Sequence, residues 1–107
     1  YLQDYAYFNL TGMKINGSTN YGLLTLVKKQ IVALETGKHD NGGNQFLHIT
    51  LPGNNGYKTN IINTYLSPSL VMPKNKLINL LLDPTNILIG DFNARHTNWG
   101  NRSNNRR

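Results

Sequence analysis

The residues with the clearest chemical potential lie near the carboxyl end, in the stretch NILIGDFNARHTNWGN (residues 86–101). A short apolar run leads there into Gly90, Asp91 and Asn93. Side chains two positions apart on an extended backbone project from the same face, so Asp91 and Asn93 are expected side by side. A carboxylate and an amide so placed could hold a water molecule or a phosphate oxygen. A simple turn after a strand is the alternative interpretation of this pair.

A second candidate is Tyr65, in the strand-like stretch IINTYLSPS (residues 61–69). A phenol stays protonated at neutral pH and can donate a hydrogen bond to a phosphoryl oxygen. A packed aromatic side chain is the alternative for this tyrosine. Ligands of open α/β sheets gather at the carboxyl ends of strands, and these candidates are expected there.

The elements that must position these residues are expected to be strands followed by a helix. Apolar runs separated by turn residues predict strands over residues 22–29, 30–34, 46–51, 58–66 and 86–89, with a loop over residues 35–45. Residues 74–83 predict a helix that ends before Pro84, with an apolar face of Leu77, Ile78, Leu81 and Leu82. This order predicts an α/β fold, with a mixed sheet that is covered by a helix on one face.

Composition bounds the function only loosely. A chain of 107 residues is long enough for one small domain, and it contains seventeen asparagines and no cysteine. The absence of cysteine excludes a disulfide framework and a thiolate metal site. Apolar runs stay well short of the roughly 20 residues of a membrane span, so no membrane partner is expected.

The net charge of +6 leaves two interpretations open. Four of the eleven basic residues fall within the last thirteen positions: Arg95, Arg102, Arg106 and Arg107. A basic surface favours a polyanion such as nucleic acid. A solvated tail that keeps the protein soluble is the alternative.

The longer string ILIGDFNARHTNWG resembles the aspartate motif of the exonuclease–endonuclease–phosphatase family, in particular the abasic-endonuclease-like domain of non-LTR retrotransposons. The matching residues are GDFNA at 90–94, His96, and the Trp99–Gly100 pair. The stretch around Tyr65 is similar to the family's Asn-x-Tyr-x-x-Pro strand. YGLLTLVKKQI (residues 21–31) is similar to another of its strands, and the resemblance runs from about Thr11 to the end of the chain.

The resemblance implies a fold and a reaction. The fold would be part of a four-layer α/β sandwich, with two packed mixed β-sheets and outer helices, and residues 1–107 would form one partial endonuclease domain. The reaction would be hydrolysis of a DNA phosphodiester, a nick that primes reverse transcription. Asp91 would orient or deprotonate water, Asn93 would hold water and phosphate in line, and Tyr65 would contact the scissile phosphate. Arg95 and His96 would bind substrate.

The same resemblance implies parts that this sequence does not show. The family uses Mg²⁺ (or Mn²⁺), held chiefly by a glutamate motif, and its domain ends in a Ser-Asp-His motif. Glu35 is the only glutamate and has the wrong context, and no Ser-Asp-His occurs. No metal ligand is therefore identified in this chain, and the fragment alone is expected to have no more than trace activity.

The expected partners are DNA and, in the parent polyprotein, a reverse transcriptase domain, with a nuclear location for the parent. Two alternatives remain open at this point. One is a phosphatase or phosphodiesterase of the same fold, and the other is a non-catalytic nucleic-acid-binding remnant.

Overall fold

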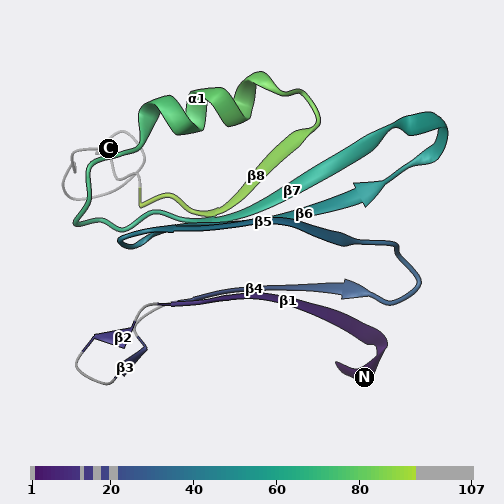
Figure 1. Ribbon diagram of the computed structural model, residues 1–107, viewed down its shortest axis with the longest axis horizontal. Coiled ribbons are helices and arrows are strands. Elements are labelled where there is room, and N and C mark those ends of the chain that lie inside the picture. The colour runs from purple at the N-terminus through teal and green to yellow at the C-terminus, as the bar shows by residue number, and fades with distance from the viewer. Residues whose placement is uncertain (1, 13, 16–17, 20–21, 94–107) are drawn as a thin grey trace, which may run out of the picture.

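The chain forms three layers (Figure 1). The computed structural model describes residues 2–12, 14–15, 18–19 and 22–93. A four-stranded sheet lies in the middle, helix α1 (Lys74–Leu82) covers one face, and a two-stranded sheet lies against the other. None of the described helices has the length and apolar character that a membrane crossing needs.

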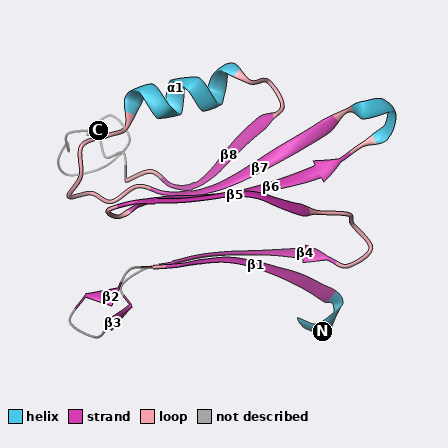
Figure 2. Cartoon of the chain, viewed as in Figure 1, coloured by secondary structure: helices cyan, strands magenta, loops and turns pink. Residues whose placement is uncertain are grey.

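The strands follow one another along the chain before the helix interrupts them (Figure 2). Their bounds are β1 Tyr5–Thr11, β2 Lys14–Ile15, β3 Ser18–Thr19, β4 Gly22–Lys28, β5 Leu34–Asn41, β6 Asn44–Pro52, β7 Lys58–Tyr65 and β8 Asn86–Asp91. Two short 3-10 turns complete the list, η1 Leu2–Asp4 and η2 Asn54–Gly56.

The larger sheet has the order β5-β6-β7-β8. Its first three strands are antiparallel neighbours, whereas β8 lies parallel to β7. A parallel pair needs a crossover connection, and α1 supplies it. The predicted mixed α/β sheet is therefore confirmed. Strands β1 and β4 form the antiparallel second sheet, and β2 pairs with β3 in a small hairpin.

The main core lies between α1 and the larger sheet. Phe46, Ile62 and Leu66 are completely buried there. Partly buried apolar side chains pack against these three, namely Leu77 and Leu80 of the helix together with Leu88 and Phe92. Alternate residues of a strand face opposite sides, so Ile62 and Thr64 face the helix while their neighbours face the second sheet.

A second contact joins the two sheets. Ile49 is buried and lines a cavity of about 390 Å³ together with Ile61 and Ile89 of the larger sheet and several residues of β4. Asn63 ties the sheets together, because its side-chain Nδ2 donates to the carbonyl of Leu24 at 3.1 Å. By the same alternation Tyr65 belongs to this inter-sheet face.

Two predicted boundaries were wrong. Residues 30–34 were expected to form a strand, but β4 ends at Lys28 and a turn follows, in which the Ile31 N–H donates to the Lys28 carbonyl at 2.9 Å. Residues 35–45 were expected to form a loop, but most of them form β5 and the start of β6. Strand β5 is an edge strand with mostly exposed polar residues, so it lacks the apolar alternation that predicts a strand.

The helix was predicted at nearly the right residues but with the wrong face. Leu77 packs on the core as expected, and Leu80 joins it. Ile78, Leu81 and Leu82 are instead 55%, 62% and 74% exposed. With apolar residues around much of its circumference, the helix does not reveal from spacing alone which side meets the sheet. An outer helix over β1 and β4, the fourth layer of the expected sandwich, is not among the described residues.

Candidate active site

Tyr65 and Asp91 form the last residue pair of the parallel strands β7 and β8. The two strands run in the same direction, so their carboxyl ends meet at one edge of the sheet (Figure 1). Asp91 is exposed and Tyr65 is half-buried. The prediction that these residues meet at strand ends is therefore confirmed.

Gly90 allows β8 to approach β7 closely just before this pair. Its φ of +138° lies in the region that favours glycine. A Cβ at this position would lie 1.9 Å from the carbonyl oxygen of Thr64, its register partner in β7. The missing side chain thus makes room for the protein's own backbone at the site.

Asp91 and Asn93 are joined by a turn. Asn93 has a φ of +48°, and its backbone N–H donates to Oδ1 of Asp91 at 2.9 Å. The expectation that both side chains project from one face of an extended backbone was therefore wrong, because β8 ends at Asp91. Between them, Phe92 packs into the helix-side core and anchors the turn. The alternative of a turn after a strand describes this local geometry.

Asn93 also links β8 to the end of β7. Its Nδ2 donates to the carbonyl of Leu66 at 2.6 Å. The N–H of Leu66 donates to the Asp91 carbonyl at 2.9 Å, which continues the pairing one residue beyond β7. Asp91, Asn93 and Tyr65 are thus held at one corner by backbone and side-chain hydrogen bonds.

This corner offers oxygen donors, which suit Mg²⁺, but not a complete metal site. Asp91 supplies a carboxylate, and one of its oxygens accepts the Asn93 N–H. Among the described residues, no group of three or more His, Cys, Asp or Glu side chains could hold a metal ion. The described part of the chain therefore does not fit a metal site of its own.

The other candidates from the sequence are separate from this corner or outside the described residues. Glu35 is exposed and pairs with Lys38 at 3.5 Å, in keeping with its lack of a metal-ligand context. Arg95 and His96, the predicted substrate-binding residues, lie outside the described residues.

Asn44 and Gln45 were missed because they fell in the predicted loop. Gln45 is the register partner of Tyr65 in the antiparallel pair of β6 and β7, and it is completely buried. Asn44 is 5% exposed, and its Oδ1 accepts the backbone N–H of Ser67 at 2.9 Å. The Asn-Gly-Gly turn just before them signals the start of a strand, and this was the available clue.

Comparison with known families finds one match, in the carboxyl-terminal part of the chain. Residues 59–107 match the family model described as endonuclease-reverse transcriptase. This part of the chain is retrotransposon endonuclease-like. The match covers somewhat less than half of the chain, and it confirms the resemblance seen in the two motifs around Tyr65 and Asp91, which lie within these residues. No curated protein and no solved structure matched the chain.

The endonuclease-like segment contains every site residue predicted from the sequence. Tyr65, Asp91 and Asn93 lie within it, and so do Arg95 and His96. Residues before 59 contribute the two-stranded sheet, together with strands β5 and β6, which extend the larger sheet beside β7. The described residues thus form an α/β fold of two packed sheets and one helix, and the part from residue 59 onward is similar to the endonuclease-reverse transcriptase family.

Proposed function

We propose that this chain is part of a DNA endonuclease domain that nicks a phosphodiester to prime reverse transcription of a retroelement. The observation that carries the proposal is the pairing of Tyr65 with Asp91 at adjoining strand ends, within the segment that matches the endonuclease-reverse transcriptase model. DNA would be the substrate, and a reverse transcriptase domain would be present in the parent protein, which would act in the nucleus.

The proposed roles follow from the chemistry of each group. Asp91 is an exposed carboxylate that can orient the attacking water or accept its proton. Tyr65 can donate a hydrogen bond to a phosphoryl oxygen. Asn93 holds the two strand ends together through Leu66, so its contribution is positioning. Arg95 and His96 are proposed to contact the DNA backbone.

A divalent cation, Mg²⁺ or Mn²⁺, is proposed as the cofactor. It would offset the charge of the phosphate. Its principal ligand is proposed to lie outside this chain, because Glu35 is the only glutamate and does not match the family's metal-ligand motif. For the same reason the 107-residue chain alone is expected to nick DNA at no more than a trace rate.

The proposal is tested with a longer protein that includes the flanking coding sequence. Its plasmid-nicking rate with Mg²⁺ should fall at least about 100-fold in Asp91→Asn, the usual range for loss of an acid–base group. Asp83→Asn is the matched control, because Asp83 is exposed and lies at the end of α1, before β8 begins, where it accepts a hydrogen bond from Thr85. That variant should nick at the parent rate.

Other outcomes point to the alternatives. Salt-sensitive DNA binding without nicking would identify a non-catalytic nucleic-acid-binding remnant. Hydrolysis of an inositol phosphate in preference to DNA, measured side by side, would identify a phosphatase of the same fold. Robust Mg²⁺-dependent nicking by the 107-residue chain, abolished by Asp91→Ala, would contradict the expected incompleteness of the site.

A further inference from the structure

The peptide group between Leu66 and Ser67, immediately after Tyr65, is held from two sides. Asn93 donates from its Nδ2 to the Leu66 carbonyl at 2.6 Å. Asn44 accepts the Ser67 N–H on its Oδ1 at 2.9 Å. Both groups belong to one peptide unit, so two asparagine side chains on neighbouring elements hold the same rigid plane. We call this arrangement the asparagine clamp.

The clamp continues the sheet where its backbone ladder ends. Strand β7 ends at Tyr65, where the neighbouring strand β6 begins, at Asn44, and the other neighbour, β8, ends, at Asp91. A side-chain carboxamide offers a donor and an acceptor like those of a peptide group. Asn44 and Asn93 can therefore replace the missing strand partners, and they keep the chain directed as it leaves the sheet.

Asn44 is itself held in a fixed turn. Just before it, Asp40 accepts the Gly43 N–H on Oδ1 and the Gln45 Nε2 on Oδ2, each at 3.1 Å. Asn44 is 5% exposed and Gln45 is completely buried, so neither side chain has room to change rotamer freely. The turn between β5 and β6 is thus connected to the end of β7.

We propose that Asn44 is a positioning residue of the Tyr65–Asp91 site. It acts through the Leu66–Ser67 peptide, which fixes the backbone next to Tyr65, and so sets where the phenol lies relative to Asp91. Catalytic groups lose efficiency when they are displaced by about 1 Å, so this restraint matters for the reaction. The expected effect of Asn44 on nicking rests on the proposed function. The hydrogen bonds of the asparagine clamp do not depend on that function.

The test compares three variants in two measurements. Asn44→Ala removes the acceptor, Asn44→Asp keeps an acceptor of the same shape, and Asn41→Ala is the control. Asn41 is the exposed register partner of Asn44 in the same hairpin. The first measurement is amide hydrogen exchange at Ser67 in the 107-residue chain. The second is kcat and KM for nicking by the longer protein.

Asn44→Ala should speed Ser67 exchange about tenfold and lower kcat about tenfold, with KM nearly unchanged, as expected for one hydrogen bond. Asn44→Asp should restore both values, and Asn41→Ala should change neither. If Asn44→Ala does not fold, Asn44→Ser serves instead, because its shorter side chain does not reach Ser67.

Unchanged Ser67 exchange in Asn44→Ala would disprove the clamp. Faster exchange with an unaltered kcat, or a low kcat that Asn44→Asp does not restore, would disprove the positioning role. Absence of nicking in the parent protein would count against the proposed function instead, and the exchange measurement would still decide whether the clamp exists.

Discussion

At the scale of single residues, Gly90 is required for two separate reasons. Its positive φ strains any L-residue, and a Cβ would meet the Thr64 carbonyl at 1.9 Å. The backbone of β7 cannot move away without breaking the β7–β8 pair. Gly90→Ala should therefore destabilise the fold by about 3 kcal/mol or more. Urea unfolding followed by circular dichroism measures this.

Gly56→Ala separates the two reasons. Gly56 also has a positive φ, +79°, but nothing lies within 4 Å of where its Cβ would be. This variant should cost only about 1 kcal/mol, the price of the backbone conformation. An equal loss of stability in both variants would show that the contact with Thr64 does not matter.

His48 gives the protein a predictable response to pH. Burial lowers the pKa of His48 below its usual 6.5, and the nearby His39 and Lys76 lower it further. The unfolded chain therefore binds a proton at this histidine more readily than the folded one. Its contribution to stability is present above pH 6.5 and is lost as the pH falls through the lowered pKa of the folded state.

His48→Gln should remove this part of the pH dependence. The variant has no titrating group at the position, so its melting temperature should fall less than that of the parent between pH 7.5 and pH 5. His39→Gln is the matched comparison, since the centre of the His39 ring lies 5.4 Å from that of His48. This change removes one of the three causes that lower the pKa of His48, and it leaves the burial and Lys76 in place. Identical pH profiles for the parent and His48→Gln would contradict the assignment.

The asparagines show what residue types alone could not reveal. Composition shows only that asparagine is abundant. In the structure, several asparagine side chains form hydrogen bonds with backbone N–H and carbonyl groups of other elements. Asn44 and Asn93 hold the peptide after Tyr65, Asn63 joins the two sheets, and Asn86 donates to the Leu80 carbonyl at the end of α1 at 2.8 Å. Such contacts depend on which strands become neighbours, and this is not visible in local sequence.

At the scale of elements, α1 allows a direct test of which face meets the sheet. Leu77 packs against the buried core, whereas Leu82 is 74% exposed. Leu77→Ala should destabilise the fold by about 2 kcal/mol, and Leu82→Ala should have almost no effect. Chemical denaturation of the two variants provides the measurement. Similar losses for both would mean that the exposed face of the helix is covered in solution.

The elements that the sequence predicted well share one property. Strands β6, β7 and β8 carry apolar residues that the core requires, and their positions followed from those residues. Strand β5 carries LETGKHDN and was missed, because it is held by pairing with β6 rather than by burial. The turn at Asn93 was one of two interpretations that the sequence left open, because the hydrogen bond from Asn93 to Leu66 joins residues that are far apart in sequence.

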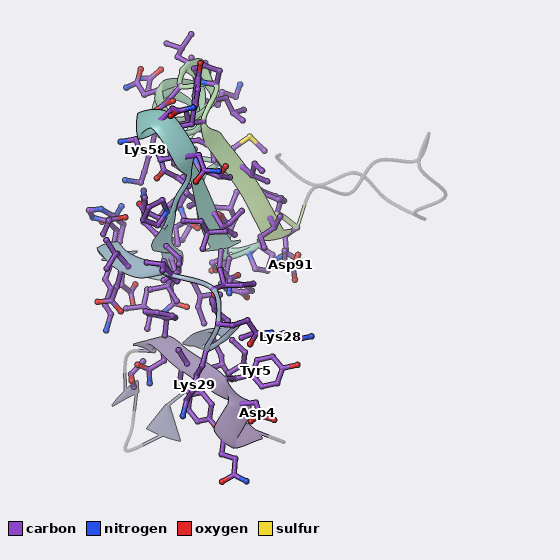
Figure 3. All side chains as sticks on the ribbon, turned by 90° about the vertical axis from the view of Figure 1, so that its right-hand side faces the viewer. Asp4, Tyr5, Lys28, Lys29, Lys58 and Asp91 are labelled. Carbon is purple, nitrogen blue, oxygen red and sulfur yellow. The ribbon has the colours of Figure 1, made fainter. Side chains whose placement is uncertain are left out.

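At the scale of the whole molecule, two lysines of the smaller sheet lie away from the candidate active site. Lys28 and Lys29 lie at the far end of β4, near Asp4 and Tyr5, and not at the end of β8 where Asp91 lies (Figures 1 and 3). Arg95 follows Asn93 by two residues in the sequence. Among these three basic residues, only Arg95 is close in sequence to Asn93 of the candidate active site.

This arrangement predicts how DNA binding depends on salt. If DNA binds at the Tyr65–Asp91 corner and Arg95 neutralises one phosphate, Arg95→Ala should make the slope of log K against log salt shallower by about 0.9. Lys28→Ala should leave the slope unchanged, because this lysine lies at the other end of the molecule. Fluorescence anisotropy with a labelled duplex, between 50 and 200 mM salt, measures both slopes. A shallower slope for Lys28→Ala with no change for Arg95→Ala would place the DNA on the β1–β4 sheet and away from the candidate active site.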